Sequence, residues 1–482
     1  MTNNESVIKN LKLPNKINKA IDMLYAGGFC AYAVGGCVRD LIMGKKPHDY
    51  DITTSALPEE VTALFSKEYT VKPTGIEHGT VTVDFEGEEL EITTFRREGN
   101  YSDHRHPDEV SFTRDLKDDL VRRDFTVNAM AFNEKEGLID IFGGVEDIKN
   151  RKIRTVGNPQ KRFNEDAIRI MRAVRFASYL EFSLEESTAL AAKKLADGLS
   201  FVAKQRLQPE LSKLICGENV VSVLLGYPEV IFAAVPELKP MWGCSQNSVY
   251  HHYDVWRHTV GVVGNMSPKL SYRLSALFHD SGKPQAKKTD KLGFDHFKGH
   301  VEISVQIADK VLEDFGYPSE LKENIHFAVL HHEEKIPVSR ARMKLLMNCG
   351  NEEKMRLLNS LQFADNQAKT FSVGTGRLNI EIDAHALIND IIESGECFSL
   401  KQLAVKGNDL AVLGIRGKEI ALTLDNLLLE VIAEKVPNEK EALLKSAESI
   451  IKEIRKNNPD YLIYLKEECS SFAEKYGKRL KG

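Results

Sequence analysis

A glycine pair followed by two closely spaced aspartates is the feature that most constrains how this chain can fold. Gly35 and Gly36 precede Arg39, and Asp49 and Asp51 follow, separated by one residue. Side chains at i and i+2 of an extended strand point to the same side, so both carboxylates can face one site. Carboxylate oxygens suit Mg²⁺, and such a pair is typical of phosphoryl transfer. The glycines would let the backbone approach a phosphate, to which Arg39 could donate charge-assisted hydrogen bonds. An Asp-x-Asp pair alone is also typical of a solvated turn, so other segments of the chain must distinguish a metal site from such a turn.

The length of 482 residues predicts several domains, because a single core rarely organises so many residues. Short β-branched runs at residues 80–83 and 90–95 alternate with helical stretches and glycine turns, which predicts an α+β unit with a mixed β-sheet. From residue 164 onward the pattern is helical, and residues 164–166 are expected to cap the first helix. We therefore expect an α+β head followed by an all-α remainder. The expected divisions are a head at 1–155, a helical neck at 156–240, a histidine-rich part at 241–370 and a helical tail at 371–482.

The charge and hydropathy of the chain limit how it could interact with nucleic acid or with a membrane. A formal net charge of −5 argues against a protein that coats nucleic acid over its whole surface, but it permits a local basic face. An arginine cluster between residues 151 and 175 indicates such a face. No apolar run approaches the roughly 20 residues of a membrane-spanning helix, so no membrane association is expected. The N-terminal residues lack a signal-peptide pattern and the 7 cysteines are scattered singly, which predicts a cytoplasmic protein with reduced thiols.

Further segments share the order and spacing of one family. They are Leu120–Met130, Leu138–Gly144 and Arg162–Phe176. Together with the glycine pair and the aspartates they resemble the bacterial class II tRNA nucleotidyltransferases, which build the 3′-terminal CCA of tRNA, and their poly(A) polymerase relatives. The resemblance covers the head and the neck. It implies an enzyme that adds CMP and AMP from CTP and ATP to the tRNA 3′ end without a nucleic-acid template, with Mg²⁺ as its cofactor.

The same resemblance implies roles for individual residues. Asp49 and Asp51 would be the catalytic metal ligands, and Glu91 is a candidate third carboxylate. An outward-facing glutamate on a strand is an equally good reading of Glu91. The residues implied to bind the nucleotide are Gly35, Gly36, Arg39, Arg123, Asp124, Asn128, Glu165, Asp166, Arg169, Arg172 and Arg175.

Asp166 and Arg169 carry the most interpretable chemistry. A helix would place side chains at i and i+3 on one face, where a carboxylate accepts and a guanidinium donates. Cytosine and adenine both present an amine donor beside a ring-nitrogen acceptor, whereas uracil and guanine present the reverse polarity. One such pair would accept CTP and ATP and reject UTP and GTP, with Glu165 steadying the arginine. The competing reading is an exposed acidic-basic pair on a helix surface.

Two other segments of the head also match family features. The polar segment between Phe95 and Phe112 is expected to be a mobile loop. It aligns with the loop that, in this family, helps the pocket change from C to A, and which the enzymes that add only CC lack. Asp140, with Gly143 and Gly144, resembles the family's hinge between head and neck.

Some positions depart from the family pattern. Asn158 stands where the family often has aspartate, and Lys204-Gln205-Arg206 replaces a usual Glu-Arg pattern, which leaves the shape of the neck open. In the tail, Arg416 and Lys418, together with the basic C-terminal residues, are candidates for contacts to the tRNA backbone.

Histidines concentrate between residues 251 and 332. Their order resembles the HD phosphohydrolase superfamily, with His279-Asp280 as the central pair. Imidazoles and carboxylates together suit Mn, Fe, Ni or Zn, and a metal-activated water could attack a phosphoester. A structural remnant that binds no metal is the alternative. The candidate ligands are His258, His279, Asp280, His300, either His331 or His332, and Asp365, with Lys283 near enough to assist a phosphate.

Several functions remain open on the sequence alone. The full enzyme would complete CCA, whereas relatives would add only the final A or would make poly(A) tails from ATP. An HD phosphohydrolase with a vestigial head and a non-catalytic tRNA-binding scaffold are the alternatives of other classes. We expect tRNA, ATP and CTP as partners and no obligate protein partner.

Overall fold

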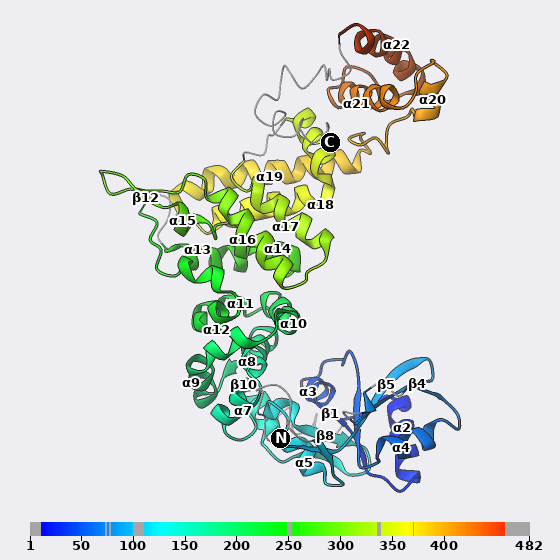
Figure 1. Ribbon diagram of the computed structural model, residues 1–482, viewed down its shortest axis with the longest axis vertical. Coiled ribbons are helices and arrows are strands. Elements are labelled where there is room, and N and C mark those ends of the chain that lie inside the picture. Colours follow the sequence, from blue (N-terminus) through cyan, green and yellow to red (C-terminus); the bar gives the residue numbers. More distant parts are fainter. Residues whose placement is uncertain are drawn as a thin grey trace. The chain divides into compact units, whose positions relative to one another are not determined.

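The computed structural model describes residues 11–72, 75–76, 79–99, 110–247, 253–334, 339–369 and 371–457. These residues form two compact units. Figure 1 shows the chain coloured along its sequence from blue to red. Unit 1 ends at Lys239 and also takes in Asp314–Gly316, whereas unit 2 consists of Pro240–Glu313 and the chain from Tyr317 onward. The finer division into head, neck, histidine-rich part and tail stays a prediction.

The head of unit 1 is built on a seven-stranded mixed sheet with the order β3-β4-β5-β2-β1-β8-β9. Strands β2 and β5 pair in parallel, and the other neighbours are antiparallel. The runs predicted at residues 80–83 and 90–95 lie in β4 and β5, although β5 ends at Thr94. The strands, blue to cyan in Figure 1, are β1 (Ala31–Val34), β2 (Asp51–Thr54), β3 (Thr70–Lys72), β4 (Thr80–Phe85), β5 (Glu88–Thr94), β8 (Met130–Asn133) and β9 (Gly137–Asp140).

Side-chain alternation decides which face of the sheet is packed. In β5, Leu90 and Ile92 are buried, whereas Glu91 between them is exposed. The buried face extends to Phe85 of β4, whose ring meets Phe65 edge-to-face at 6.0 Å between centroids. Glu91 therefore points away from the packed face. The helices of the head are α2 (Asn15–Ala26), α3 (Gly36–Ile42), α4 (Pro58–Phe65), α5 (Leu116–Val121), η2 (Thr126–Asn128) and α6 (Gly144–Lys149), with a separate strand pair β6 (Arg96–Glu98) and β7 (Val110–Phe112).

Beyond the sheet unit 1 is helical, but its first helix begins earlier than predicted. Helix α7 starts at Pro159, after Asn158, whose side chain accepts a backbone hydrogen bond at 3.0 Å. Asparagine and aspartate both cap helices well, so Asn158 does what the family's aspartate would do. Residues 164–166 end this helix, so their predicted role as the cap of the first helix is wrong. The elements are β10 (Lys152–Ile153), α7 (Pro159–Glu165), α8 (Ile168–Leu180), β11 (Ser183–Leu184), α9 (Glu186–Lys194), η3 (Ala196–Phe201), α10 (Lys204–Ile215), α11 (Val220–Gly226), α12 (Pro228–Ala234) and η4 (Pro236–Met241).

In its described residues, unit 2 is helical apart from one short strand pair, β12 (Lys288–Thr289) and β13 (Asp295–His296). The mixed sheet followed by helices confirms the predicted fold class. The short pairs β10–β11 and β12–β13 are additions that the helical pattern did not predict. The helices are α13 (Val255–Asn265), α14 (Leu270–Phe278), α15 (Lys283–Ala286), α16 (His300–Asp314), α17 (Ser319–His331), α18 (Arg340–Gln367), α19 (Phe371–Glu393), α20 (Gly407–Ala411), α21 (Lys418–Ile432) and α22 (Lys440–Asn457).

Two expectations about the whole chain can be compared with these elements. In the described part of the chain, none of the helices combines the length and the apolar character needed to cross a membrane. The cysteines whose side chains the structure describes carry free thiols, as their single spacing predicted; they are Cys30, Cys37, Cys216, Cys244 and Cys397.

Candidate functional sites

The carboxylates of Asp49, Asp51 and Glu91 gather where β2 begins. Asp51 is the first residue of β2, and the parallel pairing of β2 with β5 puts Glu91 next to it. Asp51 is exposed, but the protein around its carboxylate partly desolvates it and so raises its pKa. The charges of Asp49 and Glu91 raise this pKa further, and the charge of Arg123 lowers it. Asp49 lies before β2 starts, so the predicted placement of both aspartates on one strand does not hold, although Asp49 is close enough for its charge to act on Asp51. Among the described residues no ion pair joins these carboxylates to a lysine or arginine, and such oxygen donors suit a divalent cation.

The glycine turn is followed by Arg39, whose side chain is buried and already bonded to other side chains. Gly35 has a φ of +81°, in the left-handed region that glycine tolerates, and α3 begins at Gly36. Arg39 is 7% exposed. Its Nη1 donates to Asn128 Oδ1 at 2.7 Å, and its Nη2 lies 2.7 Å from Asp40 Oδ1. Arg39 would have to exchange these partners to contact a phosphate, which the sequence did not indicate.

A buried carboxylate that the sequence analysis missed holds Arg123. Asp119 is 0% exposed, and its oxygens lie 2.7 Å from Arg122 Nη2 and 3.0 Å from Arg123 Nη2. Burial opposes ionisation, but the charges of both arginines outweigh it and hold the pKa of Asp119 below its usual value. A Cβ added to Gly35 would lie 3.3 Å from Arg123 Nη1, so Arg123 reaches the glycine turn. The signal that could have revealed Asp119 was its i+3 and i+4 spacing from the arginines.

Arg172 joins the neck to the head. From α8 its Nε donates to Asp124 Oδ2 at 2.7 Å, and its Nη1 lies 3.4 Å from Glu210 Oε1 on α10. Glu210 also accepts from Arg175 Nε at 2.8 Å. Burial opposes the ionisation of Asp124, yet the charge of Arg172 outweighs it and lowers the pKa of Asp124. Glu210 is a second carboxylate that the sequence analysis missed.

Asp166 and Arg169 do not lie on one continuous helix. Asp166 sits between α7 and α8 with an extended backbone of φ −148° and ψ 110°. Its Oδ2 accepts from Arg206 Nη2 at 2.6 Å. The contact predicted between Arg169 and Glu165 is present, with Nη1 donating to Oε2 at 2.6 Å. The prediction that one helix places Asp166 and Arg169 on the same face is therefore wrong. Instead, the ion pair with Arg206 orients Asp166.

Asp140 and the two glycines after it form a tightly packed turn. Asp140 accepts hydrogen bonds from Gly144 N at 2.8 Å and Val145 N at 2.9 Å. Gly143 has a φ of +77°. A Cβ on Gly144 would lie 2.4 Å from the carbonyl oxygen of Thr126, so no larger residue fits there. The role of this turn as a hinge stays a prediction.

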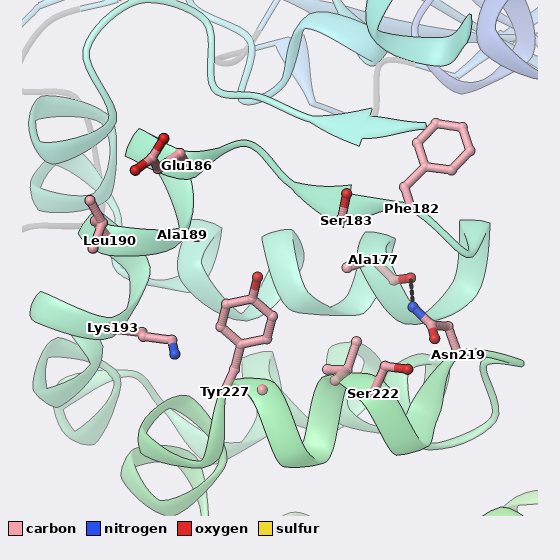
Figure 2. Close-up of a pocket in the computed structure, with 12 residues that line it drawn as sticks. Ala177, Phe182, Ser183, Glu186, Ala189, Leu190, Lys193, Asn219, Ser222 and Tyr227 are labelled. Atoms are coloured by element: carbon pink, nitrogen blue, oxygen red, sulfur yellow. Dashed lines mark hydrogen bonds between the residues drawn. The ribbon is translucent and has the colours of Figure 1, made fainter. Parts of the chain in front are cut away.

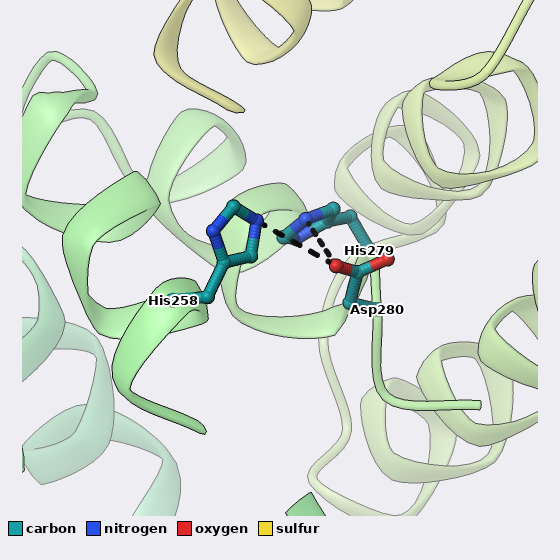
Figure 3. Close-up of side chains that lie close together, drawn as sticks. All are labelled: His258, His279 and Asp280. Carbon is teal, nitrogen blue, oxygen red and sulfur yellow. Dashed lines mark ion pairs between the residues drawn. The ribbon is translucent and has the colours of Figure 1, made fainter. Parts of the chain in front are cut away.

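In unit 2, histidines converge on the carboxylate of Asp280. Figure 3 shows the rings of His258 and His279 turned toward it. Their Nε2 atoms lie 3.7 and 3.1 Å from Asp280 Oδ2, and His258 Nε2 also lies 3.0 Å from Asp365 Oδ1. Burial lowers the pKa of His258, which favours the neutral imidazole that binds metals, although Asp365 opposes this shift.

A second group approaches the other oxygen of Asp280. His300 Nε2 lies 3.3 Å and His332 Nε2 3.7 Å from Asp280 Oδ1. His331 instead directs Nδ1 to Glu334 Oε1 at 2.9 Å. Of the two histidines left open by the sequence, the structure brings His332 rather than His331 into the group. Gln362, which the sequence analysis missed, donates to the carbonyl of His332 at 3.0 Å.

The tautomers of three of these histidines leave Nε2 available as a ligand. Each Nδ1 lies against a backbone carbonyl, which can only accept, so Nδ1 carries the proton and Nε2 the lone pair. The Nε2 of His279 is buried without a hydrogen-bond partner. The three bonds are His279 Nδ1 to Ala276 O at 2.7 Å, His300 Nδ1 to Phe297 O at 2.9 Å and His332 Nδ1 to Val329 O at 2.7 Å.

These donors form the two groups of three in the described residues whose atoms all lie within 4.8 Å of one another. One group is His258, His279 and Asp280, and the other is Asp280, His300 and His332. An imidazole lone pair that faces a carboxylate oxygen at 3.1 Å fits a metal ion placed between them. Lys283 Nζ lies 2.7 Å from Asp280 Oδ2, so an ammonium group also borders this site.

Other expected site residues cannot be compared. Residues 100–109 of the predicted loop and the basic residues after 457 lie outside the described residues. Arg416 and Lys418 are exposed where α21 begins, and their contact with RNA stays a prediction.

Comparison with known proteins relates each part of the chain to a family. Residues 31–154 match the family described as the Poly A polymerase head domain. Residues 181–225 match the family described as the probable RNA and SrmB-binding site of polymerase A, and residues 251–366 match the HD domain.

Relatives with the same name match the chain over different lengths. The CCA-adding enzyme of Lactobacillus helveticus (strain DPC 4571) is 51% identical over 216 residues, which are 44% of this chain and 53% of that protein. The chain thus spans about half the length of this relative. The CCA-adding enzyme of Staphylococcus saprophyticus is 39% identical over 293 residues, which are 61% of this chain and 69% of that protein.

A solved structure extends the likeness to most of the chain. It is the crystal structure of the Bacillus stearothermophilus CCA-adding enzyme in complex with CTP, with a TM-score of 0.64 and 27% sequence identity. The superposition covers 92% of this chain and 100% of that one.

Proposed function

The chain belongs to the family of CCA-adding enzymes, and from that premise we propose that it adds CMP and AMP, taken from CTP and ATP, to the 3′ end of tRNA. No nucleic-acid template is needed, because the protein itself reads the incoming base. The partners are then tRNA and the two nucleotides, and we propose the cytoplasm, where they meet, as the place of action.

The observation that carries this proposal is the arrangement of two sets of residues within unit 1. Carboxylates without a basic ion-pair partner gather at the start of β2, and the acceptor and donor for a base flank the break between α7 and α8. The ion pair between Asp124 and Arg172 links the two parts. A carboxylate group alone would support many phosphoryl transfers, but the added base-reading pair favours a nucleotidyltransferase.

Asp49 and Asp51 would hold Mg²⁺, with Glu91 as a further oxygen donor. The hard oxygens and the negative charges that raise the pKa of Asp51 fit this ion. When bound, Mg²⁺ lowers the pKa of the attacking hydroxyl and offsets the charge of the triphosphate. The terminal ribose hydroxyl forms a bond to the α-phosphorus, and the bond from that phosphorus to pyrophosphate breaks. Arg123, beside the glycine turn, binds the phosphate oxygens.

Asp166 and Arg169 choose the base. The carboxylate accepts from the exocyclic amine of cytosine or adenine, and the guanidinium donates to the adjacent ring nitrogen. Uracil and guanine would place a donor against Arg169 and an acceptor against Asp166, so UTP and GTP are rejected. The wrong base would leave Asp166 or Arg169 without a hydrogen-bond partner in the complex. The free-energy cost of that unpaired group makes the discrimination between bases strong.

Replacement of the proposed metal ligands tests this function. In the Asp49→Ala/Asp51→Ala double variant, addition to tRNA should fall about 1,000-fold or more, because metal stabilisation of a transition state contributes several kcal/mol. Asp84→Ala, which removes an exposed carboxylate from β4, is the matched control and should leave the rate unchanged. Survival of nucleotide addition in the double variant would show that the metal assignment is wrong.

The histidine groups of unit 2 support a second, metal-dependent phosphohydrolase activity. Because they share Asp280, each of its oxygens can serve one group, and His258, His279, His300 and His332 supply the nitrogens. Mn, Ni, Fe or Zn would fit this mixture of imidazole and carboxylate. When bound, the metal would supply an activated water for attack on a phosphoester. Lys283 would bind the phosphate.

Metal loading tests the second activity. The full chain, loaded with Mn²⁺ or Ni²⁺ and then dialysed, should retain metal and hydrolyse bis(p-nitrophenyl) phosphate. The His279→Gln/Asp280→Asn variant should lose both properties and still extend tRNA. A wild-type chain that retains no metal would rule out this activity.

A further inference from the structure

A cavity of about 390 Å³ opens in the helical part of unit 1, and none of the residues proposed to bind the nucleotide is among those that line it. It lies between α8, α9 and α11, and Figure 2 shows the ring of Tyr227 standing between the last two helices. Phe182, Leu190 and Val223 contribute further apolar surface to its lining. Small-molecule pockets usually measure roughly 300–1,000 Å³, so the volume suits one ring system rather than a protein element.

The rim of the cavity is polar, which favours a ligand with polar groups over a purely aliphatic one. Ser183, Asn219 and Ser222 line it with hydroxyl and amide groups. Lys193 Nζ lies 5.3 Å from the centroid of the Tyr227 ring, so a cation stands beside the aromatic face. Glu186 also lines the cavity, and its carboxylate would repel a phosphate. The aromatic wall and the polar edge suit a nucleobase, with its phosphate beside Lys193 and away from Glu186.

The apolar surface extends beyond the cavity. Leu190 at its edge is 64% exposed, Leu225 next to the lining residue Gly226 is 41% exposed, and Tyr179 on α8 is 56% exposed. Of these three residues, Leu190 lines the cavity itself. Most of the lining residues also fall in residues 181–225, the segment that matches a family described by RNA binding.

We propose that this cavity takes one unstacked nucleobase of the RNA substrate, which stacks on Tyr227 while Lys193 contacts the adjacent phosphate. The inference rests on the proposed function, because it names the same RNA as the ligand. Stacking serves any base, since every base has a π-face, and it would add affinity without reading sequence. An enzyme that must bind many tRNAs requires that kind of contact.

Filling the cavity and removing its ring give two independent tests. A Cβ added to Gly226 meets nothing within 4 Å, so the Gly226→Leu side chain can occupy the cavity without a backbone clash. Tyr227→Leu removes the stacking ring, and Tyr227→Phe retains it. Ala203→Leu adds the same side chain to an exposed position of the neck outside the cavity and is the matched control.

Each variant of the full chain would be titrated against a fluorescent tRNA transcript that lacks CCA, and against a single-stranded RNA oligonucleotide. Gly226→Leu and Tyr227→Leu should bind both RNAs about 5- to 150-fold more weakly, which corresponds to the stacking of one base. Tyr227→Phe and Ala203→Leu should bind like the wild type. Affinity for CTP and the thermal melting temperature should stay unchanged, which separates loss of a base contact from loss of fold.

Wild-type RNA affinity in folded Gly226→Leu and Tyr227→Leu would overturn the inference. If that happens while the wild type still extends tRNA, the proposed function survives without the cavity. If the wild type neither binds RNA nor extends tRNA, the proposed function fails, and the inference fails with it.

Discussion

The guanidinium of Arg206 holds the carboxylate of Asp166, with Nη2 donating to Oδ2 at 2.6 Å between residues 40 apart in the sequence. Asp166 lies between the last residue of α7, Glu165, and the start of α8 at Ile168, and its extended backbone takes it out of both helices. The other oxygen, Oδ1, accepts from Ile168 N at 3.2 Å. Two directional contacts thus orient the group that would read the base.

Arg206→Ala should weaken base selection without removing the metal ligands. We expect a KM for CTP and ATP about 10-fold higher, together with measurable incorporation of UMP, because Asp166 loses its orientation. Steady-state kinetics on a tRNA transcript with each of the four nucleotides measures this. Lys213→Ala, at an exposed position of the same helix, is the control. Unchanged CTP kinetics with continued exclusion of UTP would remove Arg206 from base selection.

Gly144→Ala should destabilise unit 1. The added Cβ would lie 2.4 Å from the carbonyl oxygen of Thr126 and 2.8 Å from Met130 Sδ, so the turn must shift. We expect the free energy of unfolding to fall by about 1–3 kcal/mol, as measured by urea denaturation. Gly226→Ala, where a Cβ meets open space, should leave stability equal or slightly higher. An equal loss in both variants would contradict the packing of this turn.

Glu185 should make the start of α9 sensitive to acid. Burial opposes its ionisation, but the donors of Ser187 and Thr188 outweigh it and lower the pKa of Glu185 from 4.5 to about 2. Because folding lowers the pKa of Glu185, the ionised carboxylate stabilises the folded protein at pH values above its unfolded pKa. That stabilisation is lost as the pH falls from 4.5 toward 2. Glu185→Gln should therefore lower the free energy of unfolding by about 1 kcal/mol at neutral pH.

Urea denaturation of both proteins at pH 7 and pH 4 checks the acid dependence of Glu185. The difference between wild type and variant should shrink at the lower pH. A difference that stays constant between the two pH values would mean that the carboxylate does not titrate as the hydrogen bonds imply.

His332 and His331 should differ in metal binding although they are neighbours. After loading with Mn²⁺ or Ni²⁺ and dialysis, His332→Gln should retain less metal than the wild type, because its Nε2 belongs to the group on Asp280. His331→Gln should retain the wild-type amount, since His331 contacts Glu334 instead. Elemental analysis of the purified proteins gives both values. Metal lost from His331→Gln alone would reverse the assignment.

The sequence predicted those features that depend on neighbours along the chain. The short β-branched run in residues 90–95 predicted a strand, and the alternation of side chains along that strand leaves Glu91 on the face away from the core. The contact between Glu165 and Arg169 was expected and is present, although the two residues lie on opposite sides of the break between α7 and α8.

Features that depend on distant segments could not be predicted. The break at Asp166 is supported by Arg206 from another helix, and a single sequence contains no signal for that pairing. The choice between His331 and His332 depends on how α17 is rotated in unit 2, and Gln362 of α18 fixes that end of the helix. Asp119 was missed because an acidic residue close to arginines usually lies on the surface, whereas this one is fully buried.

Extension of tRNA at single-nucleotide resolution tests the central claim most directly. Three transcripts, ending before CCA, after C and after CC, would be incubated with CTP, ATP or both in the presence of Mg²⁺. Growth of all three to CCA followed by arrest is the result that this account predicts. Extension of the CC-ended transcript alone would indicate an A-adding enzyme, and long A tails would indicate a poly(A) polymerase. Absence of any addition would contradict the account and leave the histidine site of unit 2 as the remaining candidate for activity.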